Sequence, residues 1–297
     1  MNTVILTSQT ALGETLQASF LPESGMNMIS YKKDNVEIID PTTRSLFEER
    51  YAGLGALIGP HFHRRRPETL PRIKDESIFP HIARVKAKGN IDPFSHGIAR
   101  YAPWKYQETK NSIKGTLTGK DLWNGVALSE LEGQNFTMTF AAELTPAGLT
   151  LNLSVISDTD SLVGIHYYYR LPNGVGTVKS RISPFINVNG EKHSPPSSWH
   201  LDNQKNVEIP LDQALDCTLH PFPDQLRGKI LLETSEYHLM TTYQCISQEN
   251  CWQLYHPEGA SYVCIEPISA QDPRHPNLTV SSLNINLQIF SPGQQYE

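Results

Sequence analysis

Alternation of apolar and polar residues with a period of two constrains the fold of this chain more than any other feature. The pattern runs through residues 136–144, resumes at 149–155 and returns at 283–289 near the C-terminus. Successive side chains of a strand point to opposite faces, so each run predicts a strand with one buried face and one face in water. The sequence Pro-Ala-Gly at 146–148 separates the first two runs and predicts a hairpin connection.

Shorter runs of the same kind recur along the chain, at 16–20, 113–117, 230–232 and 239–243. Gly, Pro, Asn and Asp separate them at the intervals of an antiparallel sandwich. The 21 prolines agree with this fold, because proline is tolerated in turns and at sheet edges but not inside helices. We expect short helices only around 43–51. With no repeat, low-complexity tract or linker, the chain predicts a single all-β domain over residues 1–297.

The formal net charge of −6 argues against a nucleic-acid partner, which normally requires a basic face. No apolar run approaches the roughly 20 residues needed to cross a bilayer, and the N-terminus lacks the regions of a signal peptide. The four cysteines form no Cys-x-x-Cys pair, and without an export signal we expect reduced, structural thiols. We therefore expect a cytoplasmic protein without nucleic-acid or membrane partners.

Two histidines and one carboxylate, each in a strand-like setting, are candidates for acid–base chemistry. His96 is followed by a glycine, which allows close approach to a ligand, and then by Arg100, which can bond a sugar hydroxyl or a phosphate. His166 lies in an aromatic run, and Glu266 is the one acid in an apolar stretch, where burial raises a carboxyl pKa toward neutrality. Each residue alone also fits a structural role, so only the combination predicts an acid–base site.

Together these segments resemble the aldose 1-epimerase (galactose mutarotase-like) family, especially its hexose-phosphate mutarotase branch. The resemblance spans roughly residues 14–290. Its strongest elements are a His-Gly-x-x-Arg signature, a second histidine before aromatics and a leucine, and a Glu-Pro pair. They are matched by residues 96–100 with Trp104 behind them, by 166–171 and by 266–267, and weaker matches are the segment 20–28, the hairpin 31–39 and the glycine-rich stretch 53–66.

The resemblance implies a mainly antiparallel β-supersandwich that binds a pyranose on its concave face, without a metal or an organic cofactor. Glu266 would take the proton of the anomeric hydroxyl while His166 gives one to the ring oxygen, and the opened ring would reclose with inversion. His96 would hold the substrate and assist catalysis at the oxygen where charge develops. Arg100 would orient the substrate, and Trp104 would be a further substrate-binding residue. We thus expect interconversion of the α and β anomers of a hexose or hexose 6-phosphate. The protein would be a monomer or a weak homodimer that binds a small-molecule sugar or sugar phosphate.

The chain departs from the family pattern at two places. An aspartate that binds substrate in many members is matched best by Asp216, with Asp202 as the second candidate. The usual Asn-Arg of the glycine-rich stretch is replaced by His-Phe-His-Arg-Arg-Arg at 61–66. There Arg64 and Arg66 are candidates for binding an anionic group such as a 6-phosphate, because bidentate arginine suits phosphate. A solvated basic loop explains the same run of charges.

Two other functions are compatible with parts of the sequence. A domain of the same fold could bind carbohydrate without turning it over, although such a binder has no need for an acid opposite a base. A metal-dependent β-barrel enzyme is suggested by His61 and His63, because His-x-His on a strand places both imidazoles on one face. No third ligand is evident at a suitable spacing, and Pro60 and the arginines indicate a loop.

Overall fold

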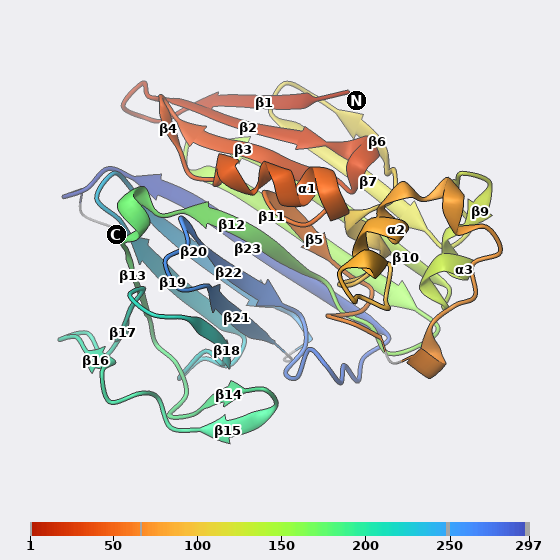
Figure 1. The fold of residues 1–297 in the computed structure, drawn as a ribbon. Coiled ribbons are helices and arrows are strands. Elements are labelled where there is room, and N and C mark those ends of the chain that lie inside the picture. The colour runs from red at the N-terminus through yellow and green to blue at the C-terminus, as the bar shows by residue number, and fades with distance from the viewer. Residues whose placement is uncertain (1, 66, 248–249, 295–297) are drawn as a thin grey trace.

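Two large antiparallel sheets make up most of the computed structural model, which describes residues 2–65, 67–247 and 250–294 (Figure 1). In spatial order the first sheet contains β1 (Val4–Gln9), β2 (Thr15–Leu21), β3 (Asn27–Lys33), β5 (Gly55–Ile58), β12 (Gly164–Arg170), β22 (Tyr262–Ile268), β21 (Cys251–His256), β18 (Leu215–Leu219), β14 (Ile186–Val188) and β15 (Glu191–His193), with β4 (Val36–Glu37) beside β3. The second contains β16 (His200–Leu201), β17 (Val207–Pro210), β13 (Thr177–Ser180), β19 (Arg227–Glu233), β20 (His238–Cys245), β23 (Val280–Phe290), β11 (Gly148–Ser157), β10 (Phe136–Thr145), β7 (Ser112–Thr118) and β6 (Lys105–Glu108). A separate small ribbon pairs β8 (Leu122–Trp123) with β9 (Val126–Ala127).

The core lies between the two sheets, where their apolar faces pack together. Phe20 of the first sheet meets Phe140 of the second at a ring-centroid distance of 5.8 Å. The hydroxyl of Tyr31 donates a hydrogen bond across the same interface to the carbonyl of Leu287 at 2.9 Å. The expected strands are confirmed, because each of the three long alternating runs lies within β10, β11 or β23 with its apolar residues buried. The predicted hairpin at 146–148 joins β10 to β11.

Three α-helices occur among the described residues, which is more than the sequence pattern predicts. The expected helix around 43–51 is confirmed as α1 (Arg44–Arg50). The expectation that helices occur only there is wrong, because α2 (Pro80–Ala87) and α3 (Leu128–Glu132) were not foreseen. Both are so short that their buried faces contain only two or three residues each, too few to show a helical period. None of the helices in the described part of the chain is long and apolar enough to span a membrane.

The outer face of the first sheet is covered, and this cover creates the space for a site. Along β12, Ile165, Tyr167 and Tyr169 enter the core between the sheets. The intervening His166 and Tyr168 point to the opposite face, where their rings stack at 4.9 Å. In Figure 1, α1 and α2 lie in front of the sheet that contains β12 and β22. The alternation of β12 therefore sends one set of aromatic side chains into the core and a histidine toward the cover.

Candidate functional site

A cavity of about 260 Å³ lies between the outer face of the first sheet and the segments that cover it. Side chains of α1 and α2 and of the loops around residues 62–64 and 90–101 line one side, and those of β12, β22, β21 and β18 line the other. Six residues predicted from the sequence share this lining: Arg64, His96, Arg100, His166, Asp216 and Glu266. The chain thus assembles candidates that are up to 202 positions apart in sequence around one cavity.

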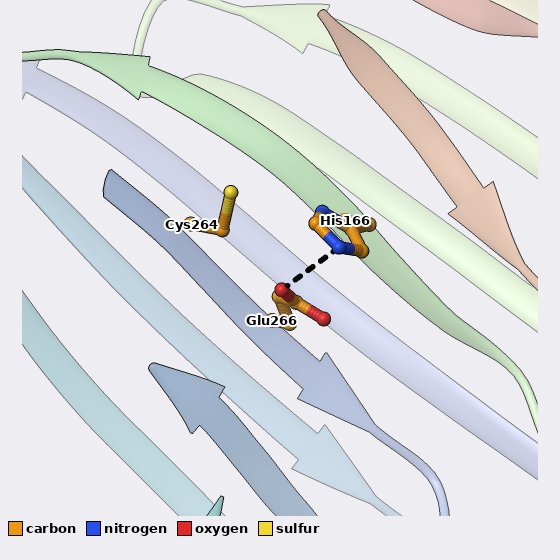
Figure 2. Close-up of side chains that lie close together, drawn as sticks. All are labelled: His166, Cys264 and Glu266. Atoms are coloured by element: carbon orange, nitrogen blue, oxygen red, sulfur yellow. Dashed lines mark ion pairs between the residues drawn. The ribbon is translucent and has the colours of Figure 1, made fainter. Parts of the chain in front are cut away.

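His166 and Glu266 are direct neighbours on adjacent strands. Gly164 lies opposite Ile268 and Tyr167 opposite Ile265, and this register places His166 across from Glu266. The His166 Nε2 atom is 3.2 Å from the Glu266 Oε1 atom, and the two side chains are only 10% and 3% exposed (Figure 2). The antiparallel ladder therefore holds an imidazole and a carboxyl group in contact at the cavity wall.

Burial moves both groups of this pair toward their uncharged forms. It raises the pKa of Glu266 well above its ordinary value, although the nearby Arg100 guanidinium works in the opposite direction. Burial also lowers the pKa of His166 well below its ordinary value, and here the charge of Arg100 adds to the effect. Both shifts favour a neutral carboxyl group and a neutral imidazole over the ion pair, so a proton shared by the two groups is kept most readily on the carboxyl group.

His96 occupies a turn, so the expectation of a strand-like setting for this residue is wrong. Its backbone φ is +69°, a left-handed conformation that no regular strand contains. The turn is fixed by the His96 amide, which donates to the carbonyl of His63 at 2.7 Å, and by the His96 carbonyl, which accepts from Gly59. The ring lies 5.3 Å from that of His166, centroid to centroid, and burial lowers its pKa well below the ordinary value.

The glycine of the His-Gly-x-x-Arg signature is required by close backbone contact. Gly97 has a φ of +89°, and a Cβ atom there would lie 2.0 Å from the carbonyl oxygen of Gly59. The chain then forms a 3₁₀ turn that ends at Arg100, whose side chain is 3% exposed. Its Nε donates to the carbonyl of Leu57 at 3.1 Å, while its Nη2 has no hydrogen-bond partner among the described residues. A buried donor of this kind suits an oxygen atom of a ligand.

Two further arginines, which were not predicted from the sequence, line the cavity. Arg50 belongs to the last turn of α1, and Arg274 belongs to the loop between β22 and β23. They join the exposed Arg64, so three separate segments contribute positive charge here. No local motif marks Arg50 or Arg274, because only the tertiary fold brings them together. The second candidate in the basic loop, Arg66, lies outside the described residues.

The aspartate candidates differ in their positions. Asp216 is exposed on β18, opposite Tyr255 of β21, and lines the cavity. Asp202 lies elsewhere, in the connection between β16 and β17, where its carboxylate accepts hydrogen bonds from the amides of Gln204 and Asn206. The structure therefore brings the preferred candidate to the cavity and leaves the second one in a turn.

Trp104 packs in the core and does not line the cavity. Its indole is 3% exposed and lies 6.3 Å from the ring of Phe140, centroid to centroid. Its Nε1 donates to the carbonyl of Ala99 at 2.9 Å. Trp104 thus supports, from the core side, the turn that contains Arg100, and its side chain has no access to a ligand in the cavity.

The His-x-His sequence does not form a strand, so its two imidazoles have different surroundings. His63 is exposed beside the cavity, whereas His61 turns inward. The Nδ1 of His61 lies 2.5 Å from a Glu132 oxygen, and its Nε2 lies 3.4 Å from an Asp92 oxygen. Arg65 binds the same Asp92 through Nε and Nη2, at 3.1 and 2.9 Å.

This charged network anchors the turn that carries the signature residues. Glu132 also accepts a hydrogen bond from the amide of Ile98 at 3.0 Å, two residues from Arg100. Asp92 accepts from the amides of Arg65 and Phe94. The network therefore ties the basic loop, the segment before His96 and the end of α3 to one another.

Solved structures resemble this chain over nearly its whole length. A galactose mutarotase-like protein from Lactobacillus casei has a TM-score of 0.65 at 14% identity, and the match covers 97% of this chain and 100% of that chain. An aldose epimerase homologue from C. elegans has a TM-score of 0.66 at 14% identity and coverages of 98% and 99%. A galactose mutarotase-like protein from Clostridium acetobutylicum has a TM-score of 0.62 at 14% identity and coverages of 98% and 99%. No protein-family model and no curated protein sequence matches the chain.

These matches agree with the observed architecture of two antiparallel sheets packed face to face. Near-complete coverage in both directions means that the whole sandwich is shared, not one sheet of it. At 14% identity such a likeness establishes the fold, whereas activity depends on the residues at the site. The sequence resemblance is thus confirmed at the level of architecture: this chain has the galactose mutarotase-like sandwich fold.

Proposed function

We propose that this protein is an aldose 1-epimerase that interconverts the α and β anomers of a hexose or hexose 6-phosphate. The observation that carries the proposal is the buried contact between His166 and Glu266 at the wall of the cavity. Ring opening requires a base at the anomeric hydroxyl and an acid at the ring oxygen, and these two oxygens share one carbon atom. An acid and a base held 3.2 Å apart match that requirement.

The proton balance of the reaction fits the electrostatics of the pair. In the reactive form, the Glu266 carboxylate removes the proton of the anomeric hydroxyl, and the His166 imidazolium protonates the ring oxygen as the C1–O5 bond breaks. This step leaves a neutral carboxyl group and a neutral imidazole, the form that burial favours. Rotation about the C1–C2 bond and the reverse transfers then close the ring from the other face. The pair ends with the proton it began with, so no cofactor is needed.

We assign substrate binding to the polar side chains around the pair. The Arg100 Nη2 atom is a buried donor without a hydrogen-bond partner among the described residues, and it would bind and orient a sugar oxygen. His96, whose ring lies beside that of His166, would hold the same end of the sugar. Asp216 would accept a hydrogen bond from a hydroxyl group farther from the reacting carbon.

A phosphorylated hexose is the substrate that the charge distribution favours. The chain has a formal net charge of −6, yet Arg50, Arg64 and Arg274 all line this one cavity. One guanidinium group can bind two phosphate oxygens at once, and a 6-phosphate lies on an exocyclic carbon that takes no part in ring opening. We therefore propose glucose 6-phosphate or a similar hexose phosphate as the preferred substrate of a cytoplasmic enzyme.

The test is anomer exchange measured by NMR with glucose, galactose and glucose 6-phosphate. Exchange should be accelerated most for the phosphorylated sugar, and Glu266→Gln should abolish the acceleration. Glu258→Gln makes the same chemical change at an exposed turn residue and should leave the rate unchanged. Sugar binding without faster exchange would refute the proposal and would identify a non-catalytic carbohydrate-binding domain of the same fold.

A further inference from the structure

Cys264 is a buried ligand-forming group beside the proposed acid–base pair, and the proposed reaction does not use it. It precedes Glu266 by two residues on β22, so both side chains point to the same face of the sheet as His166 (Figure 2). The Cys264 Sγ, a His166 ring nitrogen and a Glu266 oxygen all lie within 4.8 Å of one another. All three residues are buried, and His166 and Glu266 line the cavity.

Thiolate, imidazole and carboxylate are the three ligand types that zinc takes in proteins, at about 2.3, 2.0–2.1 and 2.0–2.2 Å. Tetrahedral ligands at those distances lie about 3.3–3.6 Å from one another. The 3.2 Å between His166 and Glu266 is within about 0.1 Å of that range, and a shift of the cysteine side chain by about 1 Å would complete the set. Magnesium and calcium prefer oxygen ligands alone, so the thiol selects against them.

We propose that His166, Cys264 and Glu266 form a three-ligand site for Zn²⁺, and that zinc bound there blocks the proposed anomer exchange. The inference rests on the proposed function for its consequence but not for the metal site itself. The cavity, which His166 and Glu266 line, gives the metal a path to the site and room for a water molecule as the fourth ligand. Binding releases two protons, one from the Cys264 thiol and one from the His166–Glu266 pair, and uses the lone pairs that His166 and Glu266 need for proton transfer.

Arg100 makes this a reversible site and not a permanent metal centre. Its guanidinium is electrostatically coupled to both Cys264 and Glu266, so its positive charge opposes a cation there. A thiolate and a carboxylate offset the two charges of zinc and leave the charge of Arg100 uncompensated. We therefore expect zinc to compete with the sugar for the site and to be removed by a chelator.

The experiment uses the full chain, freed of metal with a chelator, and Co²⁺ as a spectroscopic substitute for zinc. One Co²⁺ per chain should bind and give the ultraviolet absorption band of a cobalt–thiolate bond, and Zn²⁺ should remove that band. Cys264→Ala should lose the band and bind metal about 100-fold more weakly or worse, because even outer-shell changes cost 10–100-fold. Cys217→Ala is the matched control, since Cys217 lies on the neighbouring part of the sheet but belongs to the core.

Anomer exchange of glucose 6-phosphate, with and without Zn²⁺, gives the second measurement. Each protein is compared with its own metal-free exchange rate. Zinc should slow exchange in the wild type and in Cys217→Ala, whereas the rate of Cys264→Ala should change little. A wild type without the thiolate band, or equal zinc inhibition in Cys264→Ala, would overturn the zinc site. If the band appears but the metal-free protein does not accelerate exchange, the metal site stands and the proposed reaction fails.

Discussion

Two buried histidines near the signature turn contact carboxyl groups, and their pKa values are shifted in opposite directions. In the cavity, His166 meets Glu266, and their side chains are 10% and 3% exposed. In the network behind the turn, His61 lies between Asp92 and Glu132, at exposures of 15%, 0% and 1%. Burial lowers the pKa of His166, whereas the pKa of His61 is raised although burial works against it. Two histidines with similar burial thus have pKa values shifted in opposite directions.

The number and sign of the neighbouring charges explain the difference. His61 is close to two carboxylates, and Arg65 completes an alternating cluster in which every charge has an opposite neighbour. His166 has one carboxyl partner and lies near the positive charge of Arg100, which disfavours the imidazolium. A buried charge is stable only when it is paired and hydrogen-bonded. The network therefore stabilises ions, and the cavity pair keeps a mobile proton.

The largest expected effect is the loss of catalysis in Glu266→Gln without a loss of stability. Removing the base should slow exchange of the preferred sugar by about 10²–10⁴-fold, the usual contribution of such a group. Burial already favours the neutral carboxyl group, so a neutral amide of the same shape should change the free energy of unfolding by less than about 1 kcal/mol. NMR exchange rates and urea unfolding measure the two effects. A large loss of stability would mean that the cavity pair is ionised, like the network.

The reverse result is expected for Asp92→Asn in the network. Burial would raise the pKa of Asp92, but the neighbouring His61 and the hydrogen-bonded Arg65 hold it far below its ordinary value. The amide would leave two buried cations, His61 and Arg65, with Glu132 as their one remaining counter-charge, so we expect unfolding to become easier by about 3–5 kcal/mol. Urea unfolding measures this, with Asp224→Asn at an exposed turn as the control. A cost below about 1 kcal/mol would show that the network is not a set of stable ions.

The sequence predicts one of these two regions and not the other. Alternation is a local pattern, so β10, β11 and β23 can be found from it. In the same way, the residues on either side of His166 and of Glu266 indicate that these two residues lie in strands. The network has no such pattern, because His61 and Glu132 are 71 residues apart and meet only through tertiary packing. The sequence suggests His61 only as a metal ligand. His-x-His places both imidazoles on one face when it lies in a strand, but it predicts no common orientation in an irregular loop.

The arginines that line the cavity were predicted only in part, because some belong to local motifs and others meet only through tertiary packing. Arg64 and Arg100 belong to segments that the sequence resemblance marks, and both reach the cavity. Arg50 and Arg274 come from a helix end and from a loop after β22, where arginine is common for reasons of solvation alone. Trp104 is the opposite case. The sequence shows that it follows the signature, but not that its side chain packs in the core.

Removing the charge of Arg100 sharpens the comparison, because this charge lowers the pKa of both members of the cavity pair. The exchange rate should be constant where the pair holds one proton. It should fall at lower pH, where a second proton removes the base, and at higher pH, where loss of the last proton removes the acid. In Arg100→Gln both limits should move to higher pH, and in Arg100→Lys, which keeps the charge, they should move less. Limits that do not move in Arg100→Gln would exclude Arg100 as the cause of the difference.

The smallest expected effect is a pH dependence of stability that comes from His61 alone. Burial lowers the pKa of His61, but the carboxylates of Glu132 and Asp92 outweigh it, so the net folded-state pKa lies above the ordinary value of about 6.5. The folded state then binds the His61 proton more tightly than the unfolded chain does. The stabilisation is fully present below about pH 6.5 and is lost as the pH rises through the folded-state pKa.

Urea unfolding of the wild type and of His61→Gln at several pH values isolates this effect, because all other titrating groups are common to both proteins. The difference between their free energies of unfolding should be largest below about pH 6.5 and should shrink as the pH rises. A difference that grows with pH would mean that burial dominates at His61, as it does at His166. In that case the two histidines would belong to one class, and the carboxylates of Glu132 and Asp92 would not be enough to keep His61 charged.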